Sequence, residues 1–356
     1  MSPTSLLLYG ANGYTGALIA RLAVERGLRP ILAGRSREAV AAVAGPLGLE
    51  YRVFALEDAA AVDAALAEAR AVLLCAGPFA HTSRRVADAC LRSRTHYLDI
   101  TGEIAVFEAL AARDAEARAA GIMLLPGVGF DVVPSDCLAA HLKRQLPSAT
   151  QLALAFQALG RMSRGTANTA IENLARGGMV RRGGKLVAVP ADYKTRTVDF
   201  GRGPVTVSAI PWGDVSTAYY STGIPNIEVY TALSATTRRL LAITSYLRPL
   251  LSSYAAQRLL KWLVRSQPAG PSDAERARGA SLLWGEVSDS QGQRRLAWLR
   301  TPEAYTLTAL TALAIAEKLL AGQATAGFQT PSRAYGADLI LQIPGVTREM
   351  VEELEG

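Results

Sequence analysis

The chain has 356 residues, 50% of them hydrophobic and 19% charged, and this length and composition allow two globular domains with sizeable cores. Its three scattered cysteines exclude a disulfide scaffold or a metal knuckle and fit a reducing, cytoplasmic setting. No apolar stretch has the length of a signal peptide or a membrane span. The net charge of +7 is not gathered into a basic stripe with aromatic residues, so we expect no nucleic-acid partner. We also expect no bound metal.

The first feature of the chain is a glycine-rich turn between a predicted strand and a predicted helix. Residues 5–9 form an apolar run, residues 17–26 have a helical pattern, and the turn between them has the spacing G-x-x-G-x-x-G. Such glycines let a pyrophosphate approach the helix N-terminus, where free N–H groups attract an anion. The alternative is an ordinary strand–helix turn. The residues predicted to bind the cofactor here are Gly10, Asn12, Gly13, Tyr14, Thr15 and Gly16.

A second short strand is predicted over residues 29–33, and the residues after it indicate the type of cofactor. NAD-binding proteins usually carry Asp or Glu about 20 residues after the phosphate loop, where it binds the ribose hydroxyls. This chain has Arg35 and Ser36 there, and its first carboxylate is Glu38. A guanidinium fits a 2′-phosphate by charge and by geometry, so we predict NADP(H) as the cofactor. In the alternative, Arg35 is a solvated loop residue and the site does not discriminate.

The following segments alternate between predicted helices and predicted strands. This alternation favours a parallel sheet with right-handed crossovers, in which ligands bind outside the carboxyl ends of the strands. The predicted helices are 38–44, 58–69, 82–92 and 104–120, and the predicted strands are 51–55, 71–75, 95–100 and 122–125.

The segment after strand 71–75 lies at this predicted binding edge. Gly77 would let the backbone pass close to the cofactor ribose, and Phe79 would form a wall on the nicotinamide side. A simple glycine–proline turn is the alternative. The residues predicted to contact the cofactor in this segment are Ala76, Gly77, Pro78 and Phe79.

Two further strand ends carry candidates for proton transfer. Thr101, a predicted cofactor contact, and Glu103, a candidate acid or base, follow strand 95–100, although helix capping explains this pair equally well. Gly129, a predicted cofactor contact, and Asp131 follow strand 122–125. Asp131 does not fit a capping position, and we therefore favour it as the carboxylate that faces the substrate.

Together these motifs resemble those of the saccharopine dehydrogenase-like NADP-binding superfamily, and more narrowly its bacterial branch, which includes the trans-acting enoyl reductases. The resemblance implies a Rossmann-type domain that binds NADP(H) and a catalytic domain inserted before the last helices. It rests on the order and spacing of the segments 9–16, 33–36, 75–79, 97–103 and 126–136.

From residue 151 onward the chain has short alternating runs with glycine turns between them, which is typical of antiparallel strands. A polar and aromatic cluster, Trp212, Asp214 and Tyr219, interrupts these runs and has the character of a substrate wall. Tyr219 is a candidate proton donor, with a core tyrosine as the alternative. The predicted strands are 152–156, 185–189, 195–200, 205–210, 227–233, 281–287 and 295–300, and the predicted helices are 167–174 and 301–321.

The stretch 237–265 contains six basic residues, no acidic residue, and leucines at helical spacing. We interpret it as a lid or a dimer contact. Peripheral contact with the anionic inner membrane surface is the alternative. We expect a homodimer in the cytoplasm.

These patterns predict an α/β protein with a Rossmann-type doubly wound parallel sheet and an inserted α+β domain built on a mostly antiparallel sheet. The expected domains are 1–133, which binds NADP(H), 134–300, which binds the substrate and dimerises, and 301–356, whose helices return to the first domain. The expected function is that of an NADP(H)-dependent oxidoreductase that reduces an activated C=C (enoyl) bond, or a C=N or C=O centre, of a small or lipid-like metabolite. The expected partner is a small-molecule or acyl substrate. The alternative is a non-catalytic NADP-binding or membrane-peripheral regulatory protein.

Overall fold

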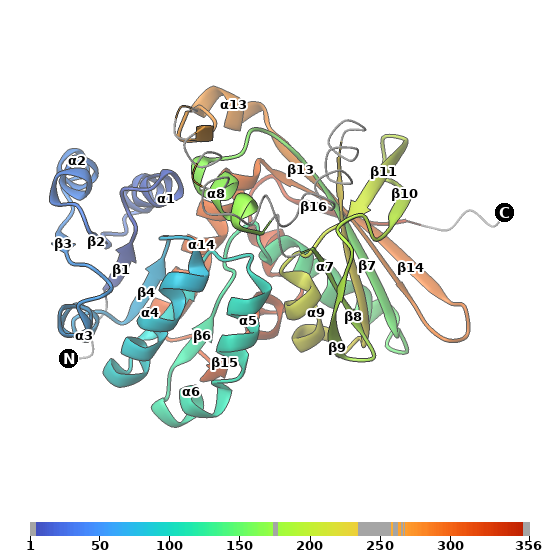
Figure 1. The fold of residues 1–356 in the computed structure, drawn as a ribbon, viewed down its shortest axis with the longest axis horizontal. Helices are drawn as coiled ribbons and strands as arrows, with labels where there is room; N and C mark the ends of the chain where they lie inside the picture. The colour runs from blue at the N-terminus through green and yellow to red at the C-terminus, as the bar shows by residue number, and fades with distance from the viewer. Residues whose placement is uncertain are drawn as a thin grey trace. The chain divides into compact units, whose positions relative to one another are not determined.

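The computed structural model describes residues 5–173, 177–233, 258, 263–264, 266 and 268–351. The chain divides into two compact units, Met1–Val133 with Tyr305–Ala334, and Pro134–Ala304 with Tyr335–Gly356. It therefore passes from one unit to the other three times (Figure 1).

The first unit is built on a seven-stranded sheet with the order β15-β6-β5-β4-β1-β2-β3, and its strands pair in parallel. Most of its strands are short apolar runs buried on both faces, as parallel sheets require. The strand order reverses between β1 and β4, which is where ligands bind in such sheets. The Rossmann-type prediction is confirmed. The strands are β1 (Leu6–Tyr9), β2 (Ile31–Gly34), β3 (Tyr51–Val53), β4 (Ala71–Leu74), β5 (His96–Asp99), β6 (Met123–Leu125) and β15 (Gly327–Phe328).

The helices of this unit form two contact groups. Helix α4 packs against α3 and α5, whereas α1 packs against α2 and also contacts α14 through Tyr14 and Tyr305. The helix predicted over 104–120 is two helices, because Arg113 leaves helical geometry and its guanidinium binds Glu116 and Asp88. The helices are α1 (Tyr14–Glu25), α2 (Arg37–Leu47), α3 (Ala59–Ala67), α4 (Phe79–Ser93), α5 (Ile104–Ala111), α6 (Asp114–Ala120), α14 (Ala304–Leu320) and α15 (Pro331–Tyr335).

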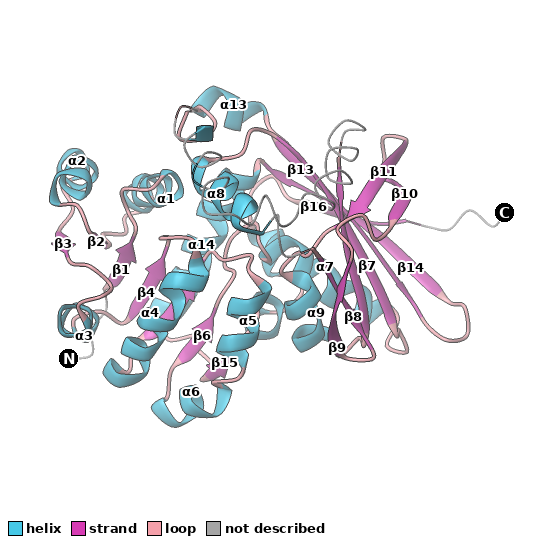
Figure 2. Cartoon of the chain, in the orientation of Figure 1, coloured by secondary structure: helices cyan, strands magenta, loops and turns pink. Residues whose placement is uncertain are grey.

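The second unit is built on a nine-stranded sheet with the order β10-β11-β12-β7-β13-β14-β16 and an attached β8–β9 hairpin (Figure 2). Its pairs are antiparallel except for β12 with β7, which confirms the prediction of a mostly antiparallel sheet. The strands are β7 (Gln151–Leu159), β8 (Gly178–Arg182), β9 (Lys185–Val189), β10 (Thr195–Asp199), β11 (Pro204–Ala209), β12 (Asn226–Ala232), β13 (Ala280–Ser288), β14 (Arg294–Pro302) and β16 (Thr347–Val351). The helices are α7 (Val133–Gln145), α8 (Arg164–Asn173), α9 (Asp214–Thr222) and α13 (Asp273–Arg278).

This second sheet curls so that β10, at one end of the strand order, contacts strands near the other end. The Trp298 indole on β14 donates to the Asp199 carbonyl at 2.8 Å, and the Arg196 guanidinium lies 4.7 Å from the centre of the Trp284 ring. The curled sheet carries an apolar core that includes Ala155, Tyr230 and Trp284. Its compactness therefore comes from the sheet itself as well as from the helices.

The predicted boundaries differ from this division at the C-terminal end of the chain. Residues 305–334 lie in the first unit, whereas residues 335–356 lie in the second. There β16 pairs with β14, and Arg348 binds the Ala337 carbonyl and the Asp338 carboxylate. Strand pairing, which the sequence pattern did not reveal at this point, carries the end of the chain back to the second sheet.

The basic stretch 237–265 lies outside the described residues except for positions 258, 263 and 264, so its predicted role as a lid, dimer contact or membrane contact stays a prediction. Within the described part of the chain, the longest helices lack the combination of length and apolar character that crossing a membrane requires.

We predict that Arg348→Ala destabilises the second unit by about 1–3 kcal/mol, because it leaves a buried carbonyl without its donor. The Arg348 side chain is 8% exposed, and its bond to the Ala337 carbonyl measures 3.0 Å. The matched control is Arg300→Ala, since Arg300 is an exposed residue on the paired strand β14 and should change stability by less than about 0.5 kcal/mol. Urea denaturation followed by tryptophan fluorescence measures both, and equal effects of the two variants would contradict the role of Arg348.

Candidate functional site

The turn between β1 and α1 has the geometry of a phosphate cradle. Gly10 has a φ of +86°, and a Cβ there would lie 2.8 Å from the backbone nitrogen of Ala76. A Cβ at Gly16 would lie 2.4 Å from the Gly10 carbonyl oxygen, so both positions require glycine. No side chain caps the N-terminus of α1. The turn therefore offers backbone donors to an anion, and it fits the pyrophosphate of a dinucleotide.

The end of β2 lies beside this cradle. A Cβ at Gly34 would lie 2.9 Å from Asn12 Oδ1, so Gly34, which the sequence reasoning did not single out, makes room for the predicted Asn12. The Ser36 hydroxyl accepts a bond from the Ala39 N–H at 3.3 Å and caps α2. Arg35 is exposed and has no ion pair within the described ranges. Burial raises the pKa of Tyr9 to about 12 and the Arg35 guanidinium opposes this rise, so Arg35 lies near the end of β1.

The segment after β4 lies against the phosphate cradle through the contact between Ala76 and Gly10. The Thr82 hydroxyl donates to the Ala76 carbonyl at 2.8 Å and holds the segment in place. Gly77 is exposed, and a Cβ there would lie 3.4 Å from the buried Phe79 ring. Ala76 thus joins Gly10 at the topological switch point, while the contacts of Gly77, Pro78 and Phe79 with the cofactor stay predictions.

Thr101 and Glu103 form a local capping arrangement. The Glu103 carboxylate accepts bonds from the N–H groups of Phe79 and Ala80 at 2.7 and 2.9 Å, and it therefore caps the N-terminus of α4. Glu103 is also the residue that directly precedes α5. The Thr101 hydroxyl accepts the Glu103 N–H at 3.1 Å and is fully buried. These contacts favour the capping alternative for both residues, and their predicted roles in catalysis and cofactor binding stay predictions.

Asp99, at the end of β5, organises the neighbouring loops, and the sequence reasoning did not include it among the site residues. Its carboxylate accepts bonds from the Tyr97 hydroxyl at 2.6 Å and from the N–H groups of Thr101 and Gly127 at 3.0 and 2.8 Å. Burial raises the pKa of Asp99 to about 6, against the effect of these three bonds. The side chain therefore ties the end of β5 to the loop after β6.

Asp131 lies in that loop, against the segment after β5. A Cβ at Gly102 would lie 2.6 Å from Asp131 Oδ2, so the carboxylate packs on the bare Gly102 backbone. No group in the described ranges donates a hydrogen bond to it. Desolvation raises the pKa of Asp131 to about 7, although the residue keeps some exposed surface. A carboxyl with this pKa exchanges a proton near neutral pH, as a general acid or base does.

Helix α14 supports this loop from a distant part of the sequence. The Phe130 N–H donates to the Thr308 hydroxyl at 3.0 Å, and the Thr311 hydroxyl donates to the Val128 carbonyl at 2.8 Å. A Cβ at Gly129 would lie 2.8 Å from Thr308 Cγ2, so the predicted Gly129 allows the loop and helix to touch. The sequence reasoning missed Thr308 and Thr311, since no local pattern marks a contact across this separation.

Tyr219 lies in the second unit, on α9. The Arg181 guanidinium stacks 4.4 Å from the centre of its ring, and the Tyr219 hydroxyl lies 3.3 Å from where a Cβ of Gly184 would be. Of the other two members of the predicted cluster, Trp212 packs on Phe156 and Asp214 accepts the Ser135 hydroxyl at 2.9 Å. The surroundings of Tyr219 are those of a packed structural tyrosine, and its role as a proton donor stays a prediction.

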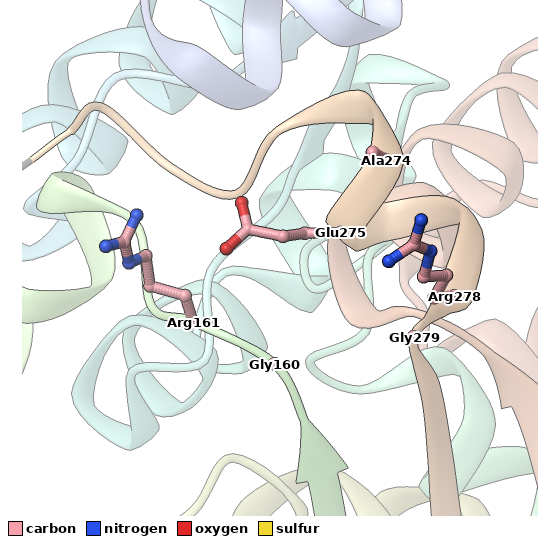
Figure 3. Close-up of a pocket in the computed structure, with 6 residues that line it drawn as sticks. All are labelled: Gly160, Arg161, Ala274, Glu275, Arg278 and Gly279. Atoms are coloured by element: carbon pink, nitrogen blue, oxygen red, sulfur yellow. The ribbon is translucent and has the colours of Figure 1, made fainter.

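The second unit contains a cavity of about 330 Å³ that none of the predicted site residues lines (Figure 3). Arg161 and Arg278 lie on either side of Glu275 there. Bonds from the Ser272 N–H and hydroxyl lower the pKa of Glu275, and the charge of Arg161 adds to this effect. The cavity thus has charges of both signs. Across the described ranges, no three His, Cys, Asp or Glu residues gather in a way that would hold a metal ion.

Comparison with protein families identifies the first unit. Residues 6–125 match the family model described as the saccharopine dehydrogenase NADP binding domain. This match confirms the resemblance drawn from the motifs, and it confirms a nicotinamide dinucleotide as the type of cofactor. The Gly10–Gly16 turn, helix α1 and Arg35 all lie within the matched residues.

Curated relatives match about two fifths of the chain. It is 33% identical over 149 residues to a trans-acting enoyl reductase of Mycobacterium leprae, covering 40% of this chain and 36% of the relative. It is 28% identical over 164 residues to a saccharopine dehydrogenase-like oxidoreductase of Mus musculus, covering 40% and 38%. Each alignment therefore spans little more than a third of the relative.

The fold of the whole chain is also known from a solved structure. Apo saccharopine dehydrogenase (L-Glu forming) from Saccharomyces cerevisiae matches with a TM-score of 0.68 at 12% identity, over 98% of this chain and 100% of that one. At this identity the likeness concerns the fold alone.

We predict that Gly16→Ala weakens NADPH binding at least roughly tenfold, because the added methyl group collides with the Gly10 backbone and widens the cradle. The matched control is Gly45→Ala in α2, where a Cβ meets nothing within 4 Å. Titration of tryptophan fluorescence with NADPH compares the two variants with the parent protein. Unchanged affinity in Gly16→Ala would rule out the cradle as the phosphate site.

Proposed function

We propose that this protein, whose first unit carries a saccharopine dehydrogenase-type NADP-binding domain, is an NADP(H)-dependent oxidoreductase that reduces an activated C=C bond of an acyl substrate. A C=N or C=O centre of a small metabolite is the second choice of reacting group. The observation that carries the proposal is the Asp131 carboxyl, which lies on the Gly102 backbone at the binding edge with a pKa near 7.

The cofactor part of the proposal rests on the residues around the end of β1. The backbone donors of the Gly10–Gly16 turn would hold the pyrophosphate, and Asn12 fits against Gly34 beside it. Arg35 is exposed and lies near Tyr9, so its guanidinium is available for a 2′-phosphate. Ser36 caps α2 and would add a hydroxyl at the same place.

The proton-transfer part of the proposal rests on Asp131. Reduction of an activated double bond adds a hydride, which NADPH supplies when bound, and a proton, which the protein must supply. A protonated Asp131 is the donor in this scheme, because desolvation raises its pKa to about 7 and so keeps a substantial fraction of the carboxyl protonated at neutral pH. Glu103 is a weaker candidate, since both its oxygens accept backbone bonds at the start of α4.

The choice of an enoyl or acyl substrate is supported by the name of the mycobacterial relatives, trans-acting enoyl reductase. These proteins match about two fifths of this chain, all at modest identity. The substrate is therefore proposed as a chemical class, an activated acyl group with a conjugated C=C. A panel of enoyl thioesters, imines and ketones with NADPH oxidation followed at 340 nm tests it.

We predict that Arg35→Ala weakens NADPH binding about tenfold or more and leaves NADH binding unchanged, since one charged contact to a phosphate contributes on the order of 1.5–3 kcal/mol. Arg37→Ala is the matched control, because Arg37 is an exposed arginine on the first turn of α2. Fluorescence titration with both dinucleotides measures the ratio. Equal affinity of the parent protein for NADPH and NADH would contradict the assignment of Arg35.

We predict that Asp131→Asn lowers kcat by about 10²–10⁴, the usual contribution of a general acid, without loss of stability. The asparagine keeps the shape of the side chain. It removes the charge of a carboxylate that receives no hydrogen bond from the described residues, so no favourable contact is lost. In the parent protein the rate of reduction should be constant below pH 7 and fall above it, because the acid form is lost as the pH rises through a pKa of about 7. A pH–rate profile that is flat from pH 5 to 9, or a fully active Asp131→Asn variant, would exclude Asp131 as the donor.

A further inference from the structure

Helix α14 contacts two loops of the first unit, the Gly10–Gly16 turn and the loop after β6 that carries Asp131. It begins about 170 residues after the last of these loops and lies in the same unit. Its first turn carries Tyr305, whose ring makes an edge contact with Tyr14 at 5.2 Å between centroids. Tyr14 is the first residue of α1 and lies within the Gly10–Gly16 turn. One helix therefore supports the phosphate turn at one point and the Asp131 loop at another.

Thr308 makes the contact of α14 with the Asp131 loop, through both its hydroxyl and its methyl group. The Thr308 hydroxyl accepts the Phe130 N–H at 3.0 Å, and its methyl group packs where a side chain at Gly129 would otherwise stand. Thr308 is 8% exposed, and Phe130 is also buried. A buried N–H needs its partner, so this bond fixes the backbone one residue before Asp131.

A second threonine extends the same support. The Thr311 hydroxyl donates to the Val128 carbonyl at 2.8 Å, and it can also donate to the Leu307 carbonyl of its own helix at 2.9 Å. Thr311 thus has an alternative acceptor inside the helix, whereas the Thr308 hydroxyl reaches across to the loop and accepts the Phe130 N–H. This asymmetry makes Thr308 the more informative position of the two.

We propose that Thr308 is a positioning residue for Asp131: its side chain holds the Gly129–Phe130 backbone and thereby places the carboxyl against Gly102, a role that rests on the proposed function. Thr308 does not contact the reacting atoms. It acts through the peptide that precedes the acid, in the way that supporting hydrogen bonds hold catalytic groups in geometry.

The pKa of Asp131 depends on this placement, because burial is what raises it. The titratable groups next to Gly102, on which the Asp131 carboxyl packs, are Asp99 at the end of β5 and Glu103 directly after Gly102. Asp99 and Glu103 accept hydrogen bonds of their own and do not donate to Asp131. If the loop loosens, water reaches the carboxyl, desolvation is relieved and the pKa of Asp131 falls toward the value of an ordinary aspartate.

The test compares Thr308→Val with Thr308→Ser. Valine keeps the branched shape that packs on Gly129 and removes the hydroxyl, whereas serine keeps the hydroxyl. Thr325→Val is the control, because Thr325 is exposed, lies in the same unit and makes no hydrogen bond among the described residues. Each variant is examined by thermal unfolding, NADPH titration, steady-state kinetics from pH 5 to 9 and hydrogen–deuterium exchange of the peptide covering residues 126–133.

The inference expects Thr308→Val to lower kcat roughly tenfold with the affinity for NADPH within about twofold of the parent. The loss of rate at high pH should begin about one pH unit lower, because the acid is better solvated. Exchange of the 126–133 peptide should rise, and Thr308→Ser should restore all three properties. Thr325→Val should match the parent protein.

Two failures are distinguishable. If Thr308→Val leaves both the exchange and the pH profile unchanged while Asp131→Asn is inactive, the positioning role is overturned and the proposed function stands. If Asp131→Asn is fully active, the proposed proton donor is refuted and the positioning role for catalysis falls with it, whatever the exchange shows. A rate loss in Thr308→Val that serine does not rescue also overturns the inference, because it would reflect packing rather than the hydroxyl.

Discussion

The geometry of the first unit depends on one buried carboxylate, that of Asp99. A carboxylate is costly to bury, and here three donors compensate: the Tyr97 hydroxyl from its own strand and the N–H groups of Thr101 and Gly127 from two separate loops. Burial still prevails, since the pKa is raised to about 6. The side chain therefore acts as a fixed point at the end of β5. It sets the path of the segment that carries Gly102 and of the loop that carries Asp131, and the two meet as a consequence.

Close backbone contacts complete the same edge of the sheet. Gly10 approaches Ala76, Gly34 approaches Asn12, Gly102 approaches Asp131 and Gly129 approaches Thr308, and at each point a Cβ would come within 3 Å of the neighbouring residue. A glycine in such a place has a packing reason beyond its conformational freedom. The contacts tie neighbouring strand ends and α14 into one surface. This surface presents backbone donors at the phosphate turn and a poorly solvated carboxyl at the other side of the switch point.

In the second unit, the buried acids lie on the curled sheet and are paired with basic side chains. Glu228 is held by Arg182, Lys194 and the Tyr230 hydroxyl, and Glu286 is held by Arg196 and Arg294. These bonds lower the pKa of Glu228 although its burial acts in the opposite direction. Such acids are structural, because their oxygens are already occupied. The polar groups of this unit that the sequence suggested for substrate contact, Asp214 and Tyr219, are likewise engaged by Ser135 and Arg181.

The sequence by itself determined the parallel sheet, the glycine turn, the order of the strand ends and the presence of Arg35 where NAD-binding proteins carry an acid. Each of these features depends on residues that lie close together along the chain. It left Glu103 undecided between capping and catalysis, and it did not separate α5 from α6 or reveal β8 and β16. Only the tertiary structure decided that Glu103 caps α4, 24 residues earlier, and that Thr308 meets Phe130 across 178 residues. It also decided the chemistry of Asp131, whose pKa depends on desolvation by segments that no local pattern connects to it. Local propensity records which elements form, whereas burial and hydrogen-bond partners arise when distant elements pack together.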